Sequence, residues 1–391
     1  MLIASTYWEG APWSFRETLP NVRVEPLVLR AADHRELSAL YWEPAQEPRA
    51  AVVAMHPRVD FTRHYTFPAL LEAGIGCLGA NSRHPNNDID TVHEEIVLDV
   101  GACVRWLRER GVATVILLGN SGGGSLSAFY QAQALLPANE RIARTPAGKR
   151  TMLPQAEMLP ADAMIYVAAH PGQGRVLGEC IDPSVIDESD PRSRDRDLDM
   201  YDPQNGFCEG WIEYSDAFVT RYRAAQRARV ERLDARAREL LLDKHIDWVM
   251  VVYRTMANLH YVDRRLDPSD RAYGSLLSDR PDLMNYKLTG FARVVTPRAW
   301  LSTWSMSSSN ADMLRHVPHI PQPTLVVSAG ADREIYPRSH VEPVVAAIGA
   351  VDRTHVSIAG AGHYFERALG ITHRDELMRT IVGWLAQRFE L

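Results

Sequence analysis

Residues 112–124 of the chain read VATVILLGNSGGG. Residues 112–118 form a short apolar run rich in β-branched side chains, as in a strand that is buried on both faces. Glycines follow, and residues 123–136 are rich in alanine and leucine, which favour a helix. The stretch therefore predicts a buried strand, a tight turn at Ser121 and a helix, in that order.

The same order of strand and helix recurs on both sides of this stretch. Because neighbouring parallel strands need a crossover connection, the alternation predicts an α/β fold with a mostly parallel, doubly wound sheet and helices on both faces. Residues 91–111 predict a long helix whose start, Thr91 to Glu94, has the form of a capping box. The expected strands are 22–30 and 36–42, joined as a hairpin, then 51–55, 75–80, 112–118, 161–169, 324–328 and 354–358, and the other expected helices are 67–73, 123–136, 340–348 and 374–389.

The alternation breaks after the sixth expected strand and returns only near residue 320. We therefore expect a first part of the core at 1–170, a helical cap inserted at 171–318 and a second part of the core at 319–391. The insertion contains a long helix at about 218–242 and an acidic run at 187–202, which we interpret as a solvated loop.

Size and composition exclude several classes of protein. The 391 residues exceed one typical domain, and with 46% hydrophobic and 24% charged residues the chain can bury a sizeable core. The net charge of −6 and the spread of basic residues, apart from 221–239, argue against a nucleic-acid partner. The four cysteines are widely separated, which argues against a disulfide framework or a structural zinc site.

The hydropathy of the chain bears on its location. The first ten residues lack a basic region followed by a long apolar run, and no segment offers about twenty uninterrupted apolar residues. We therefore expect a cytoplasmic protein that does not bind membranes. We expect a small-molecule substrate as its partner and neither a cofactor nor a metal, and the sequence leaves open whether the chain forms a homo-oligomer.

Residues 119–123, GNSGG, match the pattern G-x-S-x-G. The pattern needs a buried strand before it and a helix after it, because the serine lies on a strained turn where larger flanking side chains would clash. A phosphate-binding loop is the alternative for a glycine-rich turn, but neither G-x-G-x-x-G nor G-x-x-x-x-G-K-S/T occurs here. The surroundings therefore favour Ser121 as a nucleophile.

A serine hydroxyl is a weak nucleophile at neutral pH, so it needs a base, and the base needs an orienting carboxylate. Asp332 follows the seventh expected strand and His363 follows the eighth. Since the carboxyl ends of parallel strands share one edge of a sheet, both side chains are expected near Ser121. A loop-capping aspartate and a surface histidine are the structural alternatives. The residues that compete for these roles are Glu334, Asp352 and His355.

The three motifs together resemble the α/β-hydrolase superfamily. The likeness covers roughly residues 22–170 and 320–390 and rests on the turn at Ser121, on the aspartate after the seventh strand and on Gly360-Ala361-Gly362-His363 before the last helix. The resemblance implies the chain order serine, acid, histidine. It thus implies Ser121 as the nucleophile, Asp332 as the orienting acid and His363 as the general base.

The resemblance also implies two backbone N–H donors for the oxyanion of a tetrahedral intermediate. One would be Gly122, the residue after the nucleophile. The other would come from the loop after the third strand, where this chain has His56-Pro57-Arg58 in place of the His-Gly of many relatives. Because proline has no N–H, Arg58 is the candidate. Its guanidinium could also bind an anionic group of the substrate or form a surface salt bridge.

Substrate-contacting residues are expected on the loops at this edge and in the insertion. Aromatic side chains of the insertion would suit an apolar or aromatic group of a substrate, and the core of the insertion itself is the alternative for them. For the polar loop residues the alternative is a hydrogen-bonded loop. The candidates are His56, His84, Trp211, Tyr214, Trp300 and Trp304.

The sequence thus predicts a serine hydrolase that cleaves a carboxylic ester of a small, apolar or aromatic substrate through an acyl-enzyme. One triad serves several bond types, so a C–C bond hydrolase of the β-diketone type and a thioesterase stay open as alternatives. A non-catalytic ligand-binding protein on the same scaffold is the alternative from another class.

Overall fold

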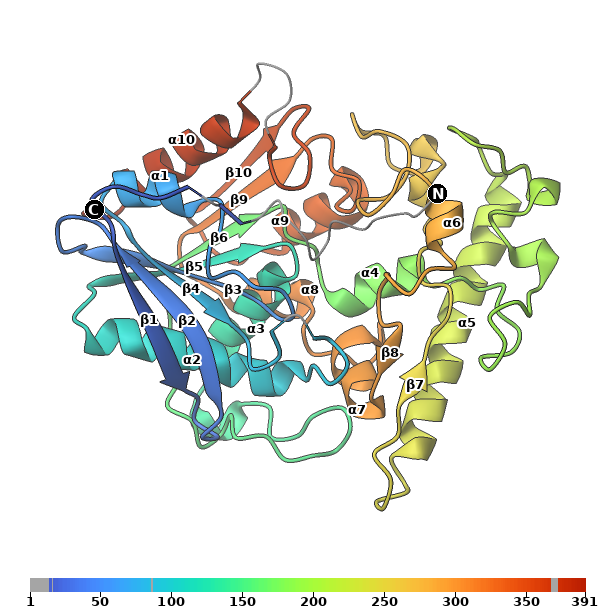
Figure 1. The fold of residues 1–391 in the computed structure, drawn as a ribbon, viewed down its shortest axis with the longest axis horizontal. Coiled ribbons are helices and arrows are strands. Elements are labelled where there is room, and N and C mark those ends of the chain that lie inside the picture. Colours follow the sequence, from blue (N-terminus) through green and yellow to red (C-terminus); the bar gives the residue numbers. More distant parts are fainter. Residues whose placement is uncertain (1–13, 16, 86, 367–371) are drawn as a thin grey trace.

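The computed structural model describes residues 14–15, 17–85, 87–366 and 372–391, so the expectation for the first ten residues lies outside it. Within the described residues an eight-stranded sheet has the order β1-β2-β4-β3-β5-β6-β9-β10 (Figure 1). The hairpin β1-β2 and the pair β2-β4 are antiparallel, and all other pairs are parallel. The predicted α/β fold is confirmed. The strands of the sheet are β1 (Arg23–Arg30), β2 (Glu36–Glu43), β3 (Ala50–His56), β4 (Gly76–Asn81), β5 (Thr114–Asn120), β6 (Ala163–Val167), β9 (Thr324–Ala329) and β10 (Arg353–Ile358).

Helices cover both faces of the sheet and bury an apolar core on each (Figure 1). The side chains of α2 and α3 pack into one core, and those of α1 and α10 pack into the other. Every residue of the central strands β3 and β4 is buried, as expected for parallel strands between two helical layers. The core helices are α1 (Phe67–Glu72), α2 (His93–Glu109), α3 (Gly123–Leu135), α8 (Met313–His316), α9 (Glu342–Ala347) and α10 (His373–Ala386).

The strands next to the predicted nucleophile end at one level. Asn120 of β5 pairs with Val167 of β6, and Val167 pairs with Val327 of β9. Ala329 of β9 pairs with Ile358 of β10. The loops that follow these strands therefore leave the sheet at a common edge, where α/β proteins place their ligands.

The segment between β6 and β9 forms a third apolar core beside the sheet (Figure 1). Its interior holds large aromatic side chains such as Tyr222 and Trp300, which are fully buried. Met313 and Val317, near the end of this segment, pack instead into the core around α3. The elements of this segment are α4 (Gln173–Cys180), α5 (Asp216–Leu240), β7 (Met250–Val251), α6 (Pro281–Met284), β8 (Val294–Val295) and α7 (Pro297–Ala299), with a π-helix at Trp300–Trp304.

Two local expectations are corrected. Helix α2 begins at His93, and Glu94 does not cap it: its carboxylate accepts hydrogen bonds from Ser302 Oγ at 2.6 Å and Asn310 Nδ2 at 2.8 Å. The acidic run is not simply solvated either. Asp199 is fully buried and forms an ion pair with Arg254 at 3.0 Å, so arginines from elsewhere in the insertion fix this segment in place.

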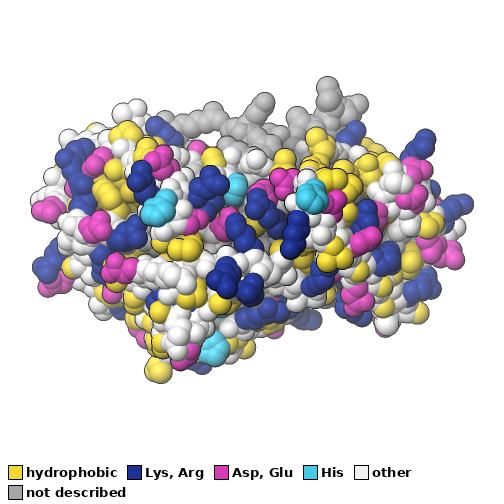
Figure 2. All heavy atoms as spheres, turned by 90° about the horizontal axis from the view of Figure 1, so that it is seen from below, with side chains coloured by type: hydrophobic (Ala, Val, Ile, Leu, Met, Phe, Trp, Pro, Cys, Tyr) yellow, Lys and Arg dark blue, Asp and Glu magenta, His cyan; other side chains and the backbone are white. Residues whose placement is uncertain are grey.

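The surface carries charges of both signs. Figure 2 shows basic, acidic and apolar side chains mixed across one face of the molecule. None of the helices in the described part of the chain combines the length and the apolarity that crossing a membrane would require.

Candidate active site

Ser121 lies on the turn between β5 and α3, at the edge where the strands end. Its backbone φ is 51°, in the left-handed region that costs a non-glycine residue about 1–3 kcal/mol. Hydrogen bonds hold the turn: Ser121 N–H donates to Val167 O at 3.3 Å, and Gly124 N–H donates to Ser121 O at 3.0 Å. The strained turn lifts the serine out of the strand, as in a nucleophile elbow.

Close packing explains the glycines around Ser121. A Cβ atom on Gly119 would lie 2.5 Å from Ser127 Oγ, and one on Gly123 would lie 2.5 Å from the carbonyl oxygen of Met55 in β3. Real Cβ atoms do not approach other atoms so closely. Helix α3 can therefore start directly above β3 only because these positions have no side chain.

Asp332 and His363 meet at the same edge. Asp332 follows β9, His363 follows β10, and His363 Nδ1 lies 2.7 Å from Asp332 Oδ2. The other carboxylate oxygen of Asp332 accepts hydrogen bonds from the N–H groups of Glu334 at 2.8 Å and Ile335 at 3.1 Å. Asp332 is 1% and His363 is 2% exposed, so the pair is shielded from water.

The second ring nitrogen of His363 is available for chemistry. Nε2 is buried and has no hydrogen-bond partner among the described residues. Burial disfavours the charged ring, but the carboxylate of Asp332, with smaller contributions from Glu334 and Glu366, more than offsets this effect and raises the pKa of His363 to about 9. The site thus holds an imidazole that binds a proton readily.

The other candidates for the roles of acid and base have different partners or surroundings. Asp352 lies at the surface and pairs with Arg388 at 2.7 Å, and His355 bonds to Ser328 Oγ at 2.9 Å. Burial raises the pKa of the Glu334 carboxyl, which favours its neutral form. Within the described residues, Asp332 is the carboxylate that bonds to His363.

The expectation for Arg58 is corrected. Its backbone N–H donates to Nδ1 of His56 at 3.2 Å, so the predicted oxyanion donor already has a partner. Its guanidinium pairs with Asp88 at 3.2 Å and lies over the rings of Trp304 at 5.3 Å and Phe291 at 5.6 Å. Arg58 thus joins the loop after β3 to the insertion.

Polar side chains crowd around Gly122, the residue after the predicted nucleophile. A Cβ atom there would lie 2.7 Å from His56 Nε2, 2.7 Å from Gln173 Nε2 and 3.2 Å from His170 Nε2. The predicted residue His56 is therefore brought to the turn. Gln173 was not predicted as a site residue. The only sequence signal for it is its position in the segment after the sixth strand, three residues beyond His170.

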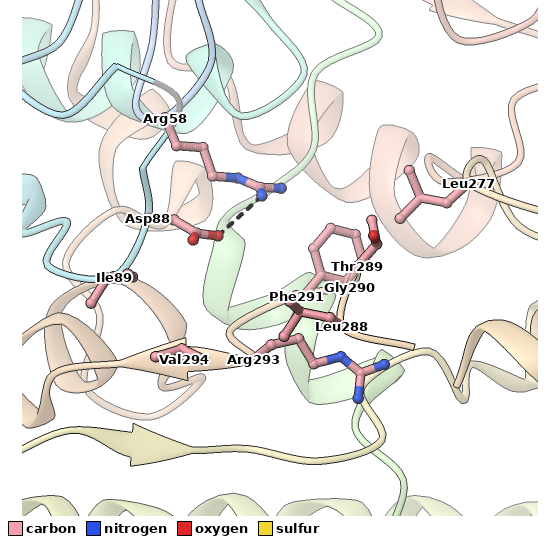
Figure 3. Close-up of a pocket in the computed structure, with 10 residues that line it drawn as sticks. All are labelled: Arg58, Asp88, Ile89, Leu277, Leu288, Thr289, Gly290, Phe291, Arg293 and Val294. Atoms are coloured by element: carbon pink, nitrogen blue, oxygen red, sulfur yellow. Dashed lines mark hydrogen bonds and ion pairs between the residues drawn. The ribbon is translucent and has the colours of Figure 1, made fainter. Parts of the chain in front are cut away.

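A hollow of about 400 Å³ lies between the core and the insertion (Figure 3). Arg58 and residues 88–89 form its core side, and Leu277 and residues 288–291 and 293–294 form the side of the insertion. Apart from Arg58, Asp88 and Arg293, the wall is largely apolar. The hollow is thus bounded by Arg58, two residues beyond His56.

The other predicted substrate-contacting residues are scattered. Tyr214 and Trp300 belong to the interior of the insertion, where Tyr214 Oη donates to Met200 O at 2.5 Å and Trp300 Nε1 donates to Asp234 at 2.7 Å, which corrects the expectation that they line a pocket. Trp304 is fully buried, its ring lies against the guanidinium of Arg58, and it does not line the hollow. Trp211 is 38% exposed at the surface of the insertion.

His84 lies apart from Ser121. It lines a separate polar hollow together with Asp33, Arg83, Asp90 and Arg298. Burial lowers the pKa of its imidazole, so the ring is predominantly neutral. The structure therefore does not bring His84 to the predicted site.

We find no metal site among the described residues. No three His, Cys, Asp or Glu side chains there are arranged to hold a metal ion. The four cysteines are free thiols, three of them buried.

Comparison with solved structures identifies the fold. The chain matches the alpha/beta hydrolase GrgF from Penicillium sp. sh18 with a TM-score of 0.51 at 12% identity, covering 93% of this chain and 98% of the other. It is similar to DcsB, solved with its substrate analogue, with a TM-score of 0.53 at 9% identity over 93% and 99% of the two chains. It is also similar to a hypothetical protein from Pseudomonas aeruginosa, with a TM-score of 0.53 at 12% identity over 96% and 98%.

These matches and the strand order define the class: the chain has the α/β-hydrolase fold. No family model matches the sequence, and no curated protein matches it. At such low identity the neighbours establish the fold alone, since one fold can host many unrelated functions.

Proposed function

We propose that this chain is a serine hydrolase that cleaves a carboxylic ester of a small, apolar or aromatic substrate. The observation that carries the proposal is the buried hydrogen bond between His363 Nδ1 and Asp332, which leaves Nε2 of the same ring without a partner among the described residues. Such a ring has one nitrogen fixed by a carboxylate and one ready to take a proton. Ser121, on its strained turn, is the hydroxyl that would supply that proton.

The proposed reaction proceeds through an acyl-enzyme. His363 Nε2 takes the proton of Ser121 Oγ as Oγ attacks the carbonyl carbon. The ester C–O bond then breaks, and His363 returns the proton to the leaving alcohol. A water molecule then attacks the acyl carbon while His363 takes a proton from that water. The acid product leaves as His363 returns this proton to Ser121 Oγ.

We propose the hollow beside Arg58 as the site of the acyl group, although Ser121, Asp332 and His363 are not among the residues that line it. Its volume of about 400 Å³ suits a small organic group, and Leu277, Leu288 and Phe291 give it apolar walls. Phe291 is 4% exposed and presents an aromatic ring, which favours a flat or apolar acyl group.

Hydrolysis of p-nitrophenyl esters of increasing chain length tests the proposal. We expect turnover with a preference for short or aromatic acyl groups, and a loss of about 10⁴-fold or more in kcat in Ser121→Ala. Ser127→Ala is the matched control: Ser127 has similar burial, but its hydroxyl donates to the carbonyl of Gly123 within α3. The control variant is expected to retain turnover.

The same assay separates the alternatives. Inactivity toward oxygen esters with turnover of a β-diketone or a thioester would move the proposal to a C–C bond hydrolase or a thioesterase. Saturable binding of an ester without turnover, unchanged in Ser121→Ala, would instead identify a ligand-binding protein.

A further inference from the structure

The N–H of Arg58 is engaged by His56, so the oxyanion needs another donor beside Gly122. We infer that the Nε2–H group of His56 is this donor and that the side-chain amide of Gln173 adds a third. The inference rests on the proposed function and deepens it, because it names the side chains that would stabilise the charged oxygen of the intermediate.

The hydrogen bonds of His56 determine which ring nitrogen carries the hydrogen. The backbone N–H groups of Arg58 and Val59 both lie 3.2 Å from Nδ1, so Nδ1 acts as an acceptor. A neutral imidazole with an unprotonated Nδ1 carries its hydrogen on Nε2. Nε2 of His56 is therefore a donor, and the loop itself fixes this tautomer.

His56 is also neutral. Burial, together with the positive charge of Arg58, holds its pKa well below the ordinary value, and the ring is 3% exposed. A neutral imidazole can donate to a developing negative charge, as neutral histidines do in other enzymes. Because the donor is held in place before the reaction, it needs no reorganisation when charge develops.

The position of His56 Nε2 suits this role. A Cβ atom on Gly122 would lie 2.7 Å from it, so the donor stands directly beside the residue that follows Ser121. The N–H of Gly122 makes no hydrogen bond within the described part of the chain. Both donors therefore lie at the residue that directly follows the nucleophile.

Gln173 adds an independent observation. It is 2% exposed, and its Nε2 is buried without a hydrogen-bond partner among the described residues. A buried polar group left unpaired costs about 1–3 kcal/mol, and native proteins rarely retain one without a reason. The amide stands as close to the Gly122 Cβ position as His56 does, at 2.7 Å. A substrate oxygen beside Gly122 would satisfy it.

Two substitutions of His56 separate the donor role from the anchoring of the loop. In His56→Asn the amide oxygen can replace Nδ1 and accept from Arg58 and Val59, but the side chain is too short to reach Gly122. In His56→Gln the amide can reach the position of Nε2 and donate there, while the loop loses its acceptor.

We expect His56→Asn to lose about 10²–10³-fold in kcat, the usual effect of removing one oxyanion donor. His56→Gln is expected to retain at least about tenfold more kcat than His56→Asn, since it restores a donor. A glutamine variant no better than the asparagine variant would mean that His56 only anchors the loop, which overturns the inference. Absence of ester turnover in the wild-type protein would instead contradict the proposed function.

A second measurement uses the wild-type protein alone. A trifluoromethyl ketone forms a hemiketal with a reactive serine, and nuclear magnetic resonance of isotope-labelled histidine reports the proton on each ring nitrogen. We expect His56 to be protonated on Nε2 in the free protein and its Nε2–H signal to move when the ketone reacts with Ser121. A signal that stays unchanged in fully reacted protein would overturn the inference.

Discussion

His363 Nδ1 lies 2.7 Å from Asp332 Oδ2, although 31 positions separate the two residues in the chain. The parallel pairing of β9 with β10 brings them together, because each residue lies in the loop after one of these strands. The carboxylate orients the ring and favours its charged form, as in the acid–histidine pair of a catalytic triad.

Replacing the carboxylate of Asp332 should impair catalysis without removing the base. Asp332→Asn cannot hold the charged ring, so we expect kcat to fall by about 10³–10⁴-fold. Asp352→Asn is the matched control, since Asp352 directly precedes β10, at the opposite edge of the sheet, and pairs with Arg388 at the surface. Steady-state kinetics of both variants measures this difference in kcat. An equal fall in kcat in the two variants would argue against a catalytic role for the Asp332–His363 pair.

The raised pKa of His363 predicts the direction of the pH dependence. Only the neutral ring can accept the proton of Ser121, and the neutral fraction grows with pH. We therefore expect kcat/KM to rise with pH and to level off only above a pKa of about 9. In Asp332→Asn the midpoint should move to lower pH, because the charge that raises the pKa is gone. A wild-type profile already flat at neutral pH would contradict this assignment.

The close approach of α3 to β3 predicts a large stability effect at one glycine. In Gly123→Ala the new Cβ would lie 2.5 Å from Met55 O, and we expect a loss of about 1–3 kcal/mol in the free energy of unfolding. Gly383→Ala in α10 is the control, because no atom lies within 4 Å of its Cβ position. A helix-interior alanine there should gain about 0.5–1 kcal/mol. Denaturant unfolding of both variants measures the contrast, and equal stability would contradict the packing described.

The hollow between core and insertion predicts where specificity lies. Phe291→Leu should raise KM for aromatic esters relative to short aliphatic ones by about tenfold, since it removes a ring from the wall. Phe218→Leu is matched in chemistry and burial, but Phe218, on α5, does not line the hollow. Its variant should lose stability and keep the substrate preference. A shift in preference for both variants would argue against this hollow as the acyl site.

Much of the fold could be predicted from the sequence because it is encoded locally. Short apolar runs alternate with amphipathic segments, and this pattern fixed the order of strands and helices. The residues at the strand ends could be proposed for the same reason: the topology of a parallel sheet places Ser121, Asp332 and His363 at one edge, whatever the loops between them do.

The roles of several other residues could not be predicted, because they depend on contacts between residues far apart in the sequence. Glu94 has the spacing of a capping residue, yet its carboxylate bonds to Ser302, 208 positions away. Trp300 reads equally well as a pocket residue or a core residue, and its bond to Asp234 places it in the core. Gln173 carries no motif, and only the three-dimensional approach to Gly122 distinguishes it. Arg58 was misassigned because the sequence does not show that His56 binds its N–H.

Mapping the site of covalent labelling tests the central claim most directly. The folded protein is treated with a fluorophosphonate, and mass spectrometry locates the adduct. We predict one phosphonyl group per chain, attached to Ser121, with labelling lost in Ser121→Ala and strongly slowed in His363→Ala. An adduct on another residue, or ester hydrolysis that persists undiminished in Ser121→Ala, would contradict the account.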